Sequence, residues 1–163
     1  GQRSGAAASL CQKKAGALGG GVEVCGGIQM WVLNWDSTGE LLTSSCDEVI
    51  QKLNGLNQEY RHKQPNIIKI ESDSKKSLTI GVGAQEGLSC LTYFPFHNGL
   101  GSMHPVPPDD QYCDCEETII FWMNSYDSEF EMKDLIPYEE AIRQVLYFLQ
   151  NDNISTNLSW EPD

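Results

Sequence analysis

The chain has 163 residues, enough for one domain with a sizeable core, and it is strongly acidic. It carries 11 basic and 23 acidic side chains, for a formal net charge of −12. This charge disfavours binding to nucleic-acid phosphates, and no apolar run approaches the length of a membrane span. An acidic domain suits a basic protein partner, because opposite charges speed association, although solubility alone would also explain the charge.

Residues 1–29 differ in composition from the rest of the chain. They are rich in Gly and Ala and contain three basic residues and one acidic residue. Part of this segment, residues 9–16, resembles the translated recombination-site linker of cloning vectors, and Met30 stands directly before the first convincing strand. We therefore expect a vector-derived or flexible leader at 1–29, with a basic transit peptide as the alternative. We expect a single domain at 30–163, which has 8 basic and 22 acidic side chains and thus a formal charge of −14.

The six cysteines are spread along the chain without the tight spacing of a disulfide framework. We therefore expect free thiols, as in a protein of the reducing cytoplasm.

The first half of the domain predicts short strands and one helix. β-Branched and aromatic residues gather in short runs that end at turn-forming residues. These runs are residues 30–35, 40–42, 66–70, 78–83 and 88–94. In the fourth run, Leu78, Ile80 and Val82 alternate and share one face. Ser45 stands three residues before Glu48, the spacing of a capping box, and predicts a helix ending near residue 60.

The second half begins with residues 95–117, which read as a long loop. Such a loop inside a compact domain is usually functional or mobile. Residues 118–123 are almost continuously apolar and predict a central strand. A turn at 124–128 then leads into a short strand at 129–132.

The loop contains residues that are chemically able to bind zinc. His97, His104, Cys113 and Cys115 are all zinc-ligand types, but their spacing matches no common zinc pattern. A nucleophilic pair between one of these histidines and Cys90 or Cys113 is a further alternative, although nothing local supports it. We therefore expect no metal, no cofactor and no catalytic site. The alternative is a small metal-binding or thiol enzyme that uses this loop.

Residues 109–134 contain nine carboxylates and a single base. Three of these carboxylates alternate at 127, 129 and 131, so they share one face if the strand contains all of them. A run of charge is usually a solvated surface, and the alternative is a surface that binds a basic partner, anchored by an exposed tyrosine. The candidate partner-binding residues are Asp109, Asp110, Tyr112, Asp114, Glu116, Glu117, Tyr126, Asp127, Glu129 and Glu131.

The C-terminal stretch predicts a helix followed by a strand. Apolar residues recur at three- and four-residue steps from Tyr138 to Leu149, and Pro137 suits the first helical turn. The run 151–153 predicts the helix end, because Asn tolerates a left-handed cap, and a short strand with Trp160 closes the chain. These elements predict an α+β domain with an antiparallel-dominated sheet of about six strands and two helices on one side.

The order of these C-terminal elements also resembles a known family. An Ile-Pro step, a Glu-Glu-Ala helix with an aromatic-Leu pair, a polar turn and a strand with one Trp are similar to the C-terminal signature of the first-numbered immunity family of bacterial polymorphic-toxin systems. This family includes an inhibitor of a DNA cytosine deaminase toxin. The turn at 153–156 departs from the usual family sequence. The residues that carry the resemblance are Pro137, Glu140, Ala141, Phe148 and Trp160.

The resemblance implies a function in binding rather than in catalysis. It implies an immunity protein that neutralises a cognate toxin, either a nuclease or a nucleic-acid deaminase, by occluding the toxin's active site with an acidic surface. The implied partner is therefore a basic toxin domain, with no nucleic acid and no membrane bound.

Overall fold

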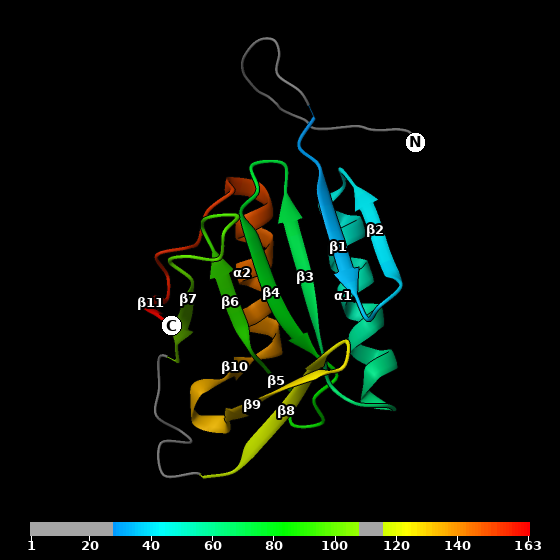
Figure 1. Ribbon diagram of the computed structural model, residues 1–163, viewed down its shortest axis with the longest axis vertical. Helices are drawn as coiled ribbons and strands as arrows, with labels where there is room; N and C mark the ends of the chain where they lie inside the picture. Colours follow the sequence, from blue (N-terminus) through cyan, green and yellow to red (C-terminus); the bar gives the residue numbers. More distant parts are fainter. Residues whose placement is uncertain (1–27, 108–115) are drawn as a thin grey trace. The chain divides into compact units, whose positions relative to one another are not determined.

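The computed structural model describes residues 28–107 and 116–163 (Figure 1). All helices and strands of the described residues lie within the unit Trp31–Asp163. Its strands are β1 (Trp31–Trp35), β2 (Gly39–Thr43), β3 (Asn66–Ser72), β4 (Ser77–Val82), β5 (Leu88–Ser89), β6 (Leu91–Phe94), β7 (Met103–Val106), β8 (Thr118–Met123), β9 (Tyr126–Glu131), β10 (Ile136–Pro137) and β11 (Ser159–Pro162). Its helices are α1 (Cys46–Arg61), the short 3-10 helix η1 (Met132–Asp134) and α2 (Tyr138–Asn151).

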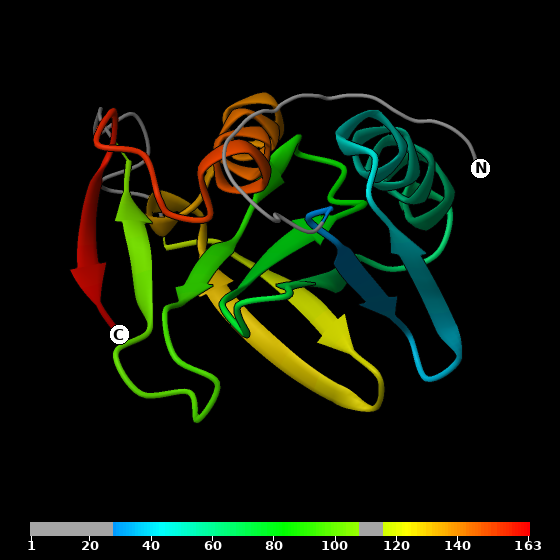
Figure 2. The ribbon, with the colours of Figure 1, turned by 90° about the horizontal axis from the view of Figure 1, so that it is seen from above.

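Nine of the described strands form one sheet. Seven follow the order β11-β7-β6-β4-β3-β1-β2, and β8 and β9 branch from β3. The pairing of β3 with β8 is parallel, whereas every other pairing is antiparallel. Both α-helices cover the same face of this sheet (Figure 2). The predicted α+β fold with two helices on one side is therefore confirmed, but the sheet has more strands than the expected six.

Local signals place both helices. Ser45 caps α1 as predicted, since its hydroxyl oxygen accepts a hydrogen bond from the backbone N–H of Glu48 at 3.1 Å. The end of α2 differs from the expectation, because the left-handed residue is Asp152, with φ 55°, and not an asparagine. Asp152 also accepts a hydrogen bond from the Ser72 hydroxyl at 2.8 Å, so the end of α2 is bonded to the end of β3.

The main core lies between the helices and the sheet. Leu78, Ile80 and Val82 are fully buried in it, as their predicted common face requires. In α2, the fully buried Phe148 faces this core, whereas Leu146 is 36% exposed. The opposite face of the sheet carries no helix in the described residues and is covered in part by the β8–β9 hairpin (Figure 2).

The structure corrects the expected strands at three places. The loop predicted at 95–117 contains the strand β7, which pairs with β11 and places Pro105 opposite Trp160. The sequence does not indicate this strand, because proline is uncommon inside strands. The run 88–94 divides at Cys90 into two strands, which pair with β10 and β4 respectively. The expected turn at 124–128 is shorter, since β9 already begins at Tyr126.

Candidate partner-binding surface

The most prominent surface feature is the hairpin of β8 and β9. The central strand predicted at 118–123 is in fact one arm of this hairpin, because β8 pairs with β9 along its length and with β3 only at Asn66 and Trp122. A two-residue turn joins the arms, and its Asn124 has φ 57°, which suits the tight turns of hairpins. Figure 2 shows the hairpin extending away from the face of the sheet that lacks helices.

The hairpin register brings the three alternating carboxylates onto one face. Directly opposed residues of an antiparallel pair share a face. Because Asp127 lies opposite Trp122 and Glu129 opposite Ile120, these apolar side chains adjoin the carboxylates, and Glu131 continues the acidic row. We call this face, made by Thr118, Ile120, Trp122, Asp127, Glu129 and Glu131, the outer face of the hairpin. The apolar half of this face is not predicted by the sequence, because the nearly continuous apolar run 118–123 does not indicate which of its two faces is exposed.

The other candidate residues take different positions. Glu116 and Glu117 are exposed just before β8. Tyr126 is 77% exposed at the hairpin turn, but it lies opposite Met123 and therefore on the face away from the carboxylate row. The remaining four candidates lie outside the described residues: Asp109, Asp110, Tyr112 and Asp114.

A second apolar cluster attaches the hairpin to the sheet. Ile119 and Phe121 point toward the sheet and are buried against residues of β3 and of the β4–β5 region. Phe121 lies directly on Gly81 of β4, where an added Cβ would be only 2.5 Å from the ring. The backbone N–H of Trp122 also donates to the carbonyl of Pro65 at 2.9 Å. The sheet therefore fixes the position of the hairpin.

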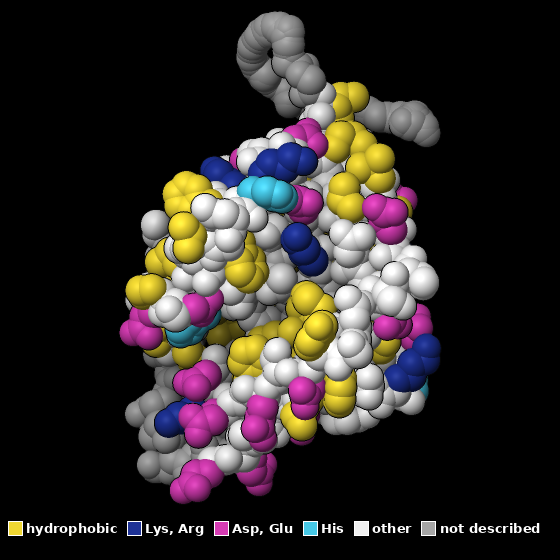
Figure 3. Space-filling view, viewed as in Figure 1, with side chains coloured by type: hydrophobic (Ala, Val, Ile, Leu, Met, Phe, Trp, Pro, Cys, Tyr) yellow, Lys and Arg dark blue, Asp and Glu magenta, His cyan; other side chains and the backbone are white. Residues whose placement is uncertain are grey.

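The outer face is acidic and only partly neutralised. Lys133 lies 3.6 Å from Glu131, but both side chains are substantially exposed, so this ion pair contributes little. The Thr118 hydroxyl donates to Glu129 at 2.8 Å, which orients that carboxylate without removing its charge. In Figure 3, acidic side chains gather over the lower part of the molecule, where the hairpin lies in Figure 1. The arrangement is suited to binding a basic surface and offers an apolar stripe beside the charge.

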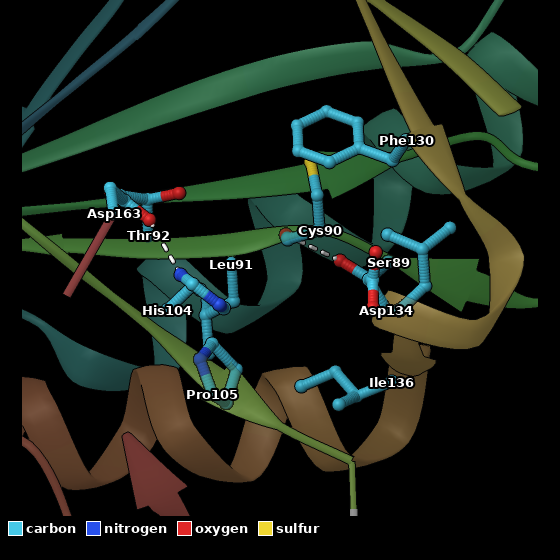
Figure 4. Close-up of a pocket in the computed structure, with 11 residues that line it drawn as sticks. Ser89, Cys90, Leu91, Thr92, His104, Pro105, Phe130, Asp134, Ile136 and Asp163 are labelled. Atoms are coloured by element: carbon cyan, nitrogen blue, oxygen red, sulfur yellow. Dashed lines mark hydrogen bonds and ion pairs between the residues drawn. The ribbon is translucent and has the colours of Figure 1, made fainter. Parts of the chain in front are cut away.

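A cavity of about 230 Å³ lies beside β9, and its lining bears on the alternative that the chain is a thiol enzyme. Cys90, Thr92, His104, Phe130 and Asp134 are among its lining residues. Cys90 and His104 thus approach the same cavity, but the thiol points toward Phe130 and the imidazole points toward Asp163 (Figure 4).

The chemistry of these two side chains does not favour nucleophilic catalysis. Burial raises the pKa of the Cys90 thiol to about 12, so it stays protonated at neutral pH, whereas a nucleophile needs the thiolate. His104 Nδ1 lies 2.6 Å from Asp163 Oδ1, and its Nε2 lies 3.9 Å from Glu161.

The metal-binding alternative also gains no support from the described residues. Among residues 28–107 and 116–163, no group of three or more His, Cys, Asp or Glu side chains is arranged to hold a metal ion. His97 pairs instead with Glu71 at 3.5 Å. Cys113 and Cys115 lie outside the described residues.

A second hollow, of about 710 Å³, lies between α1 and α2. Arg61, Tyr138, Glu139 and Arg143 line it, together with asparagine and glutamine side chains of α1. Arg143 is bonded to Glu140 at 2.7 Å, so charges of both signs meet here. This hollow has no strong preference for either charge.

The residues that carry the family resemblance have structural positions. Ala141 and Phe148 are fully buried, and Phe148 makes an edge-to-face contact with Tyr93 at 6.2 Å. The Trp160 indole donates to the carbonyl of Ser155 at 2.9 Å. Pro137 directly precedes α2.

Glu140 is held ionised in the first turn of α2. Burial opposes its ionisation, but hydrogen bonds from Gln144 and Arg143 outweigh burial and lower the pKa of the carboxyl. These contacts fix the start of α2, away from the hairpin carboxylates.

Comparisons with known proteins leave the family open. No protein-family model matches the chain, and no curated protein matches it. Neither α-helix in the described ranges has the length and apolar character needed to cross a membrane.

Proposed function

We propose that this chain is an immunity protein, which binds a cognate bacterial toxin that acts on nucleic acid and covers the toxin's active site with the outer face of the hairpin. The observation that carries the proposal is the row of Asp127, Glu129 and Glu131 on one exposed face. A toxin that acts on nucleic acid needs a basic cleft for phosphates. A carboxylate row on a projecting hairpin complements such a cleft in charge.

The apolar half of the outer face supports the same function. Affinity in protein interfaces comes mainly from a few desolvated aromatic or aliphatic anchors, while charges set association rate and partner choice. Ile120 is 39% exposed and Trp122 is half-buried, and both lie directly beside the carboxylates. The outer face therefore supplies both the apolar anchors for affinity and the charges for fast association.

The C-terminal resemblance to the immunity family agrees with this proposal, as does the net charge of −12. The proposal locates the protein in the cytoplasm, where such a toxin meets its substrate. It requires no cofactor and no catalytic residue in this chain.

The direct test is co-expression with the toxic domain encoded by the neighbouring gene. We expect growth of the host to be rescued by this chain and the two proteins to co-purify as a tight complex. Toxicity that persists in the presence of this chain, with no complex formed, would refute the proposed function.

A charge-reversal series tests the surface itself. The variant D127K/E129K/E131K is compared with E40K/E86K/E139K, which changes net charge equally at exposed sites outside β8 and β9. We expect the first variant to slow association by at least about tenfold and to weaken its salt dependence, because steering depends on where the charge lies. Equal effects in both variants, measured by stopped-flow binding, would remove the hairpin from the interface.

A further inference from the structure

The outer edge of β9 is unpaired in the described residues. β9 pairs with β8 and with no other described strand, and its side chains are exposed apart from the half-buried Phe130. An unpaired edge presents a row of backbone N–H and C=O groups that can pair with another chain. In an antiparallel hairpin, the backbone groups of alternate residues point toward the partner strand and those of the residues between them point outward. We call this alternation the hydrogen-bond phase, and it decides which β9 residues have outward groups.

Two hydrogen bonds fix this phase. The Met132 N–H donates to the Glu117 carbonyl at 2.9 Å, so residues 117 and 132 form a hydrogen-bonded pair. Because hydrogen-bonded and non-hydrogen-bonded pairs alternate in an antiparallel ladder, Phe130, Ser128 and Tyr126 also bond toward β8. The Trp122 N–H agrees with this phase, since it points away from β9 and donates to Pro65.

The outward backbone groups therefore belong to Asp127, Glu129 and Glu131. Within the described residues, Asp127 and Glu129 each direct an unpaired N–H and C=O to this edge. Glu131 directs its N–H there, while its carbonyl begins the 3-10 turn of η1. The three carboxylates line the outer face beside the edge. A strand added at this edge would place its own residues directly opposite them, at the distance where side chains of opposite charge attract.

The other face of an added strand would meet the cavity beside β9. Phe130 lines that cavity, as do Leu91 and Pro105, so its walls are largely apolar next to the edge. Side chains of an added strand that fall between its basic residues would point toward this cavity, since successive residues of a strand point to opposite faces.

From this geometry, we propose that the edge of β9 binds an extended segment of the partner in which Lys or Arg alternates with apolar residues, so that the segment adds a strand to the hairpin. The basic side chains face the carboxylate row, and an apolar side chain enters the cavity. The inference rests on the proposed function only for the identity of the partner. This mode of recognition takes affinity from main-chain hydrogen bonds and specificity from alternate side chains.

A peptide experiment separates strand addition from simple charge attraction. The probe is the peptide Lys-Val-Lys-Val-Lys-Val-Lys, and the control is the same peptide methylated at the backbone nitrogen of each Lys, which keeps the charge but cannot donate. With the full chain at low salt, we expect the methylated peptide to bind at least about tenfold more weakly. Equal binding of both peptides, or binding of neither at millimolar concentration, would overturn the inference.

Amide hydrogen exchange followed by NMR gives a residue-specific readout. On binding of the unmethylated peptide, we expect the amides of Asp127, Glu129 and Glu131 to become protected, whereas those of Ser128 and Phe130 are already protected in the free protein. Protection without this alternation would contradict strand addition.

A variant pair tests the same edge in the toxin complex. Glu129→Gln removes only the charge, whereas Glu129→Pro also removes the outward N–H, at an edge position where proline is tolerated. We expect Glu129→Pro to bind the toxin about tenfold more weakly than Glu129→Gln. If rescue by the unaltered chain holds but the two variants bind equally, strand addition is wrong while the immunity function stands.

Discussion

The contact between Gly81 and Phe121 helps to attach the hairpin to the sheet, and Gly81→Ala perturbs this contact directly. An alanine Cβ at this position would lie 2.5 Å and 2.7 Å from two atoms of the Phe121 ring and 2.8 Å from Cys90 Sγ. Ordinary contacts of this kind are ~3.5–4.0 Å, so the ring or the strand must move by about 1 Å. Phe121 is fully buried, so moving its ring disturbs the neighbouring core side chains.

The magnitude follows from two opposing effects. Overpacking a filled core costs about 1–3 kcal/mol, and replacing glycine by alanine in a strand recovers about 0.5–1 kcal/mol of chain entropy. We therefore expect a net loss of about 1–2 kcal/mol in the free energy of unfolding. For a domain of this size, each kcal/mol corresponds to about 3–5 °C in Tm.

The assay is urea unfolding of Gly81→Ala, of Phe121→Leu and of the double variant. Because the smaller leucine leaves room for the alanine methyl, the double variant should lose less stability than the sum of the single losses. Gly55→Ala in α1 is the matched control, since nothing lies within 4 Å of its added Cβ, and it should gain about 0.5–1 kcal/mol. A Gly81→Ala variant as stable as the unaltered chain would refute this account of the hairpin attachment.

The remaining predictions concern two buried polar groups, Cys90 and Asn57. The Cys90 thiol should resist alkylation at pH 8 in the folded chain and react only after unfolding, as measured by peptide mass spectrometry; modification without unfolding would contradict its burial. Burial raises the pKa of the Cys90 thiol from 9.0 to about 12. The stability that comes from keeping this thiol neutral is therefore complete below pH 9 and is lost as the pH rises toward 12. In urea unfolding, Cys90→Ala should show a smaller decline of stability over this pH range. Asn57→Ala should cost about 1–3 kcal/mol, because Asn57 Oδ1 accepts the buried Gly83 N–H at 2.7 Å. Asn57→Asp keeps an acceptor there and should lose less of the hydrogen bond, and equal stability of Asn57→Ala and the unaltered chain would exclude this role.

Elements that depend on local chemistry can be predicted from the amino-acid sequence alone. The Ser45 cap, the alternating face of Leu78, Ile80 and Val82, and the helix at 138–151 all follow from preferences that act within a few residues. The common face of the carboxylates at 127, 129 and 131 follows from alternation in the same way. These features could be predicted because one strand or one helical turn contains all the interacting groups.

Contacts between distant parts of the chain determine which strands are central and which edge is unpaired in the described residues. An apolar run such as 118–123 has the same sequence signal whether both faces are buried or one face is exposed. The sequence therefore predicts a central strand where the structure has one arm of a hairpin. The pairing of β7 with β11 and the contact of Phe121 with Gly81 join residues far apart in the chain. The hydrogen-bond phase, which directs the backbone of Glu129 outward, depends on register between strands, and no local preference specifies it.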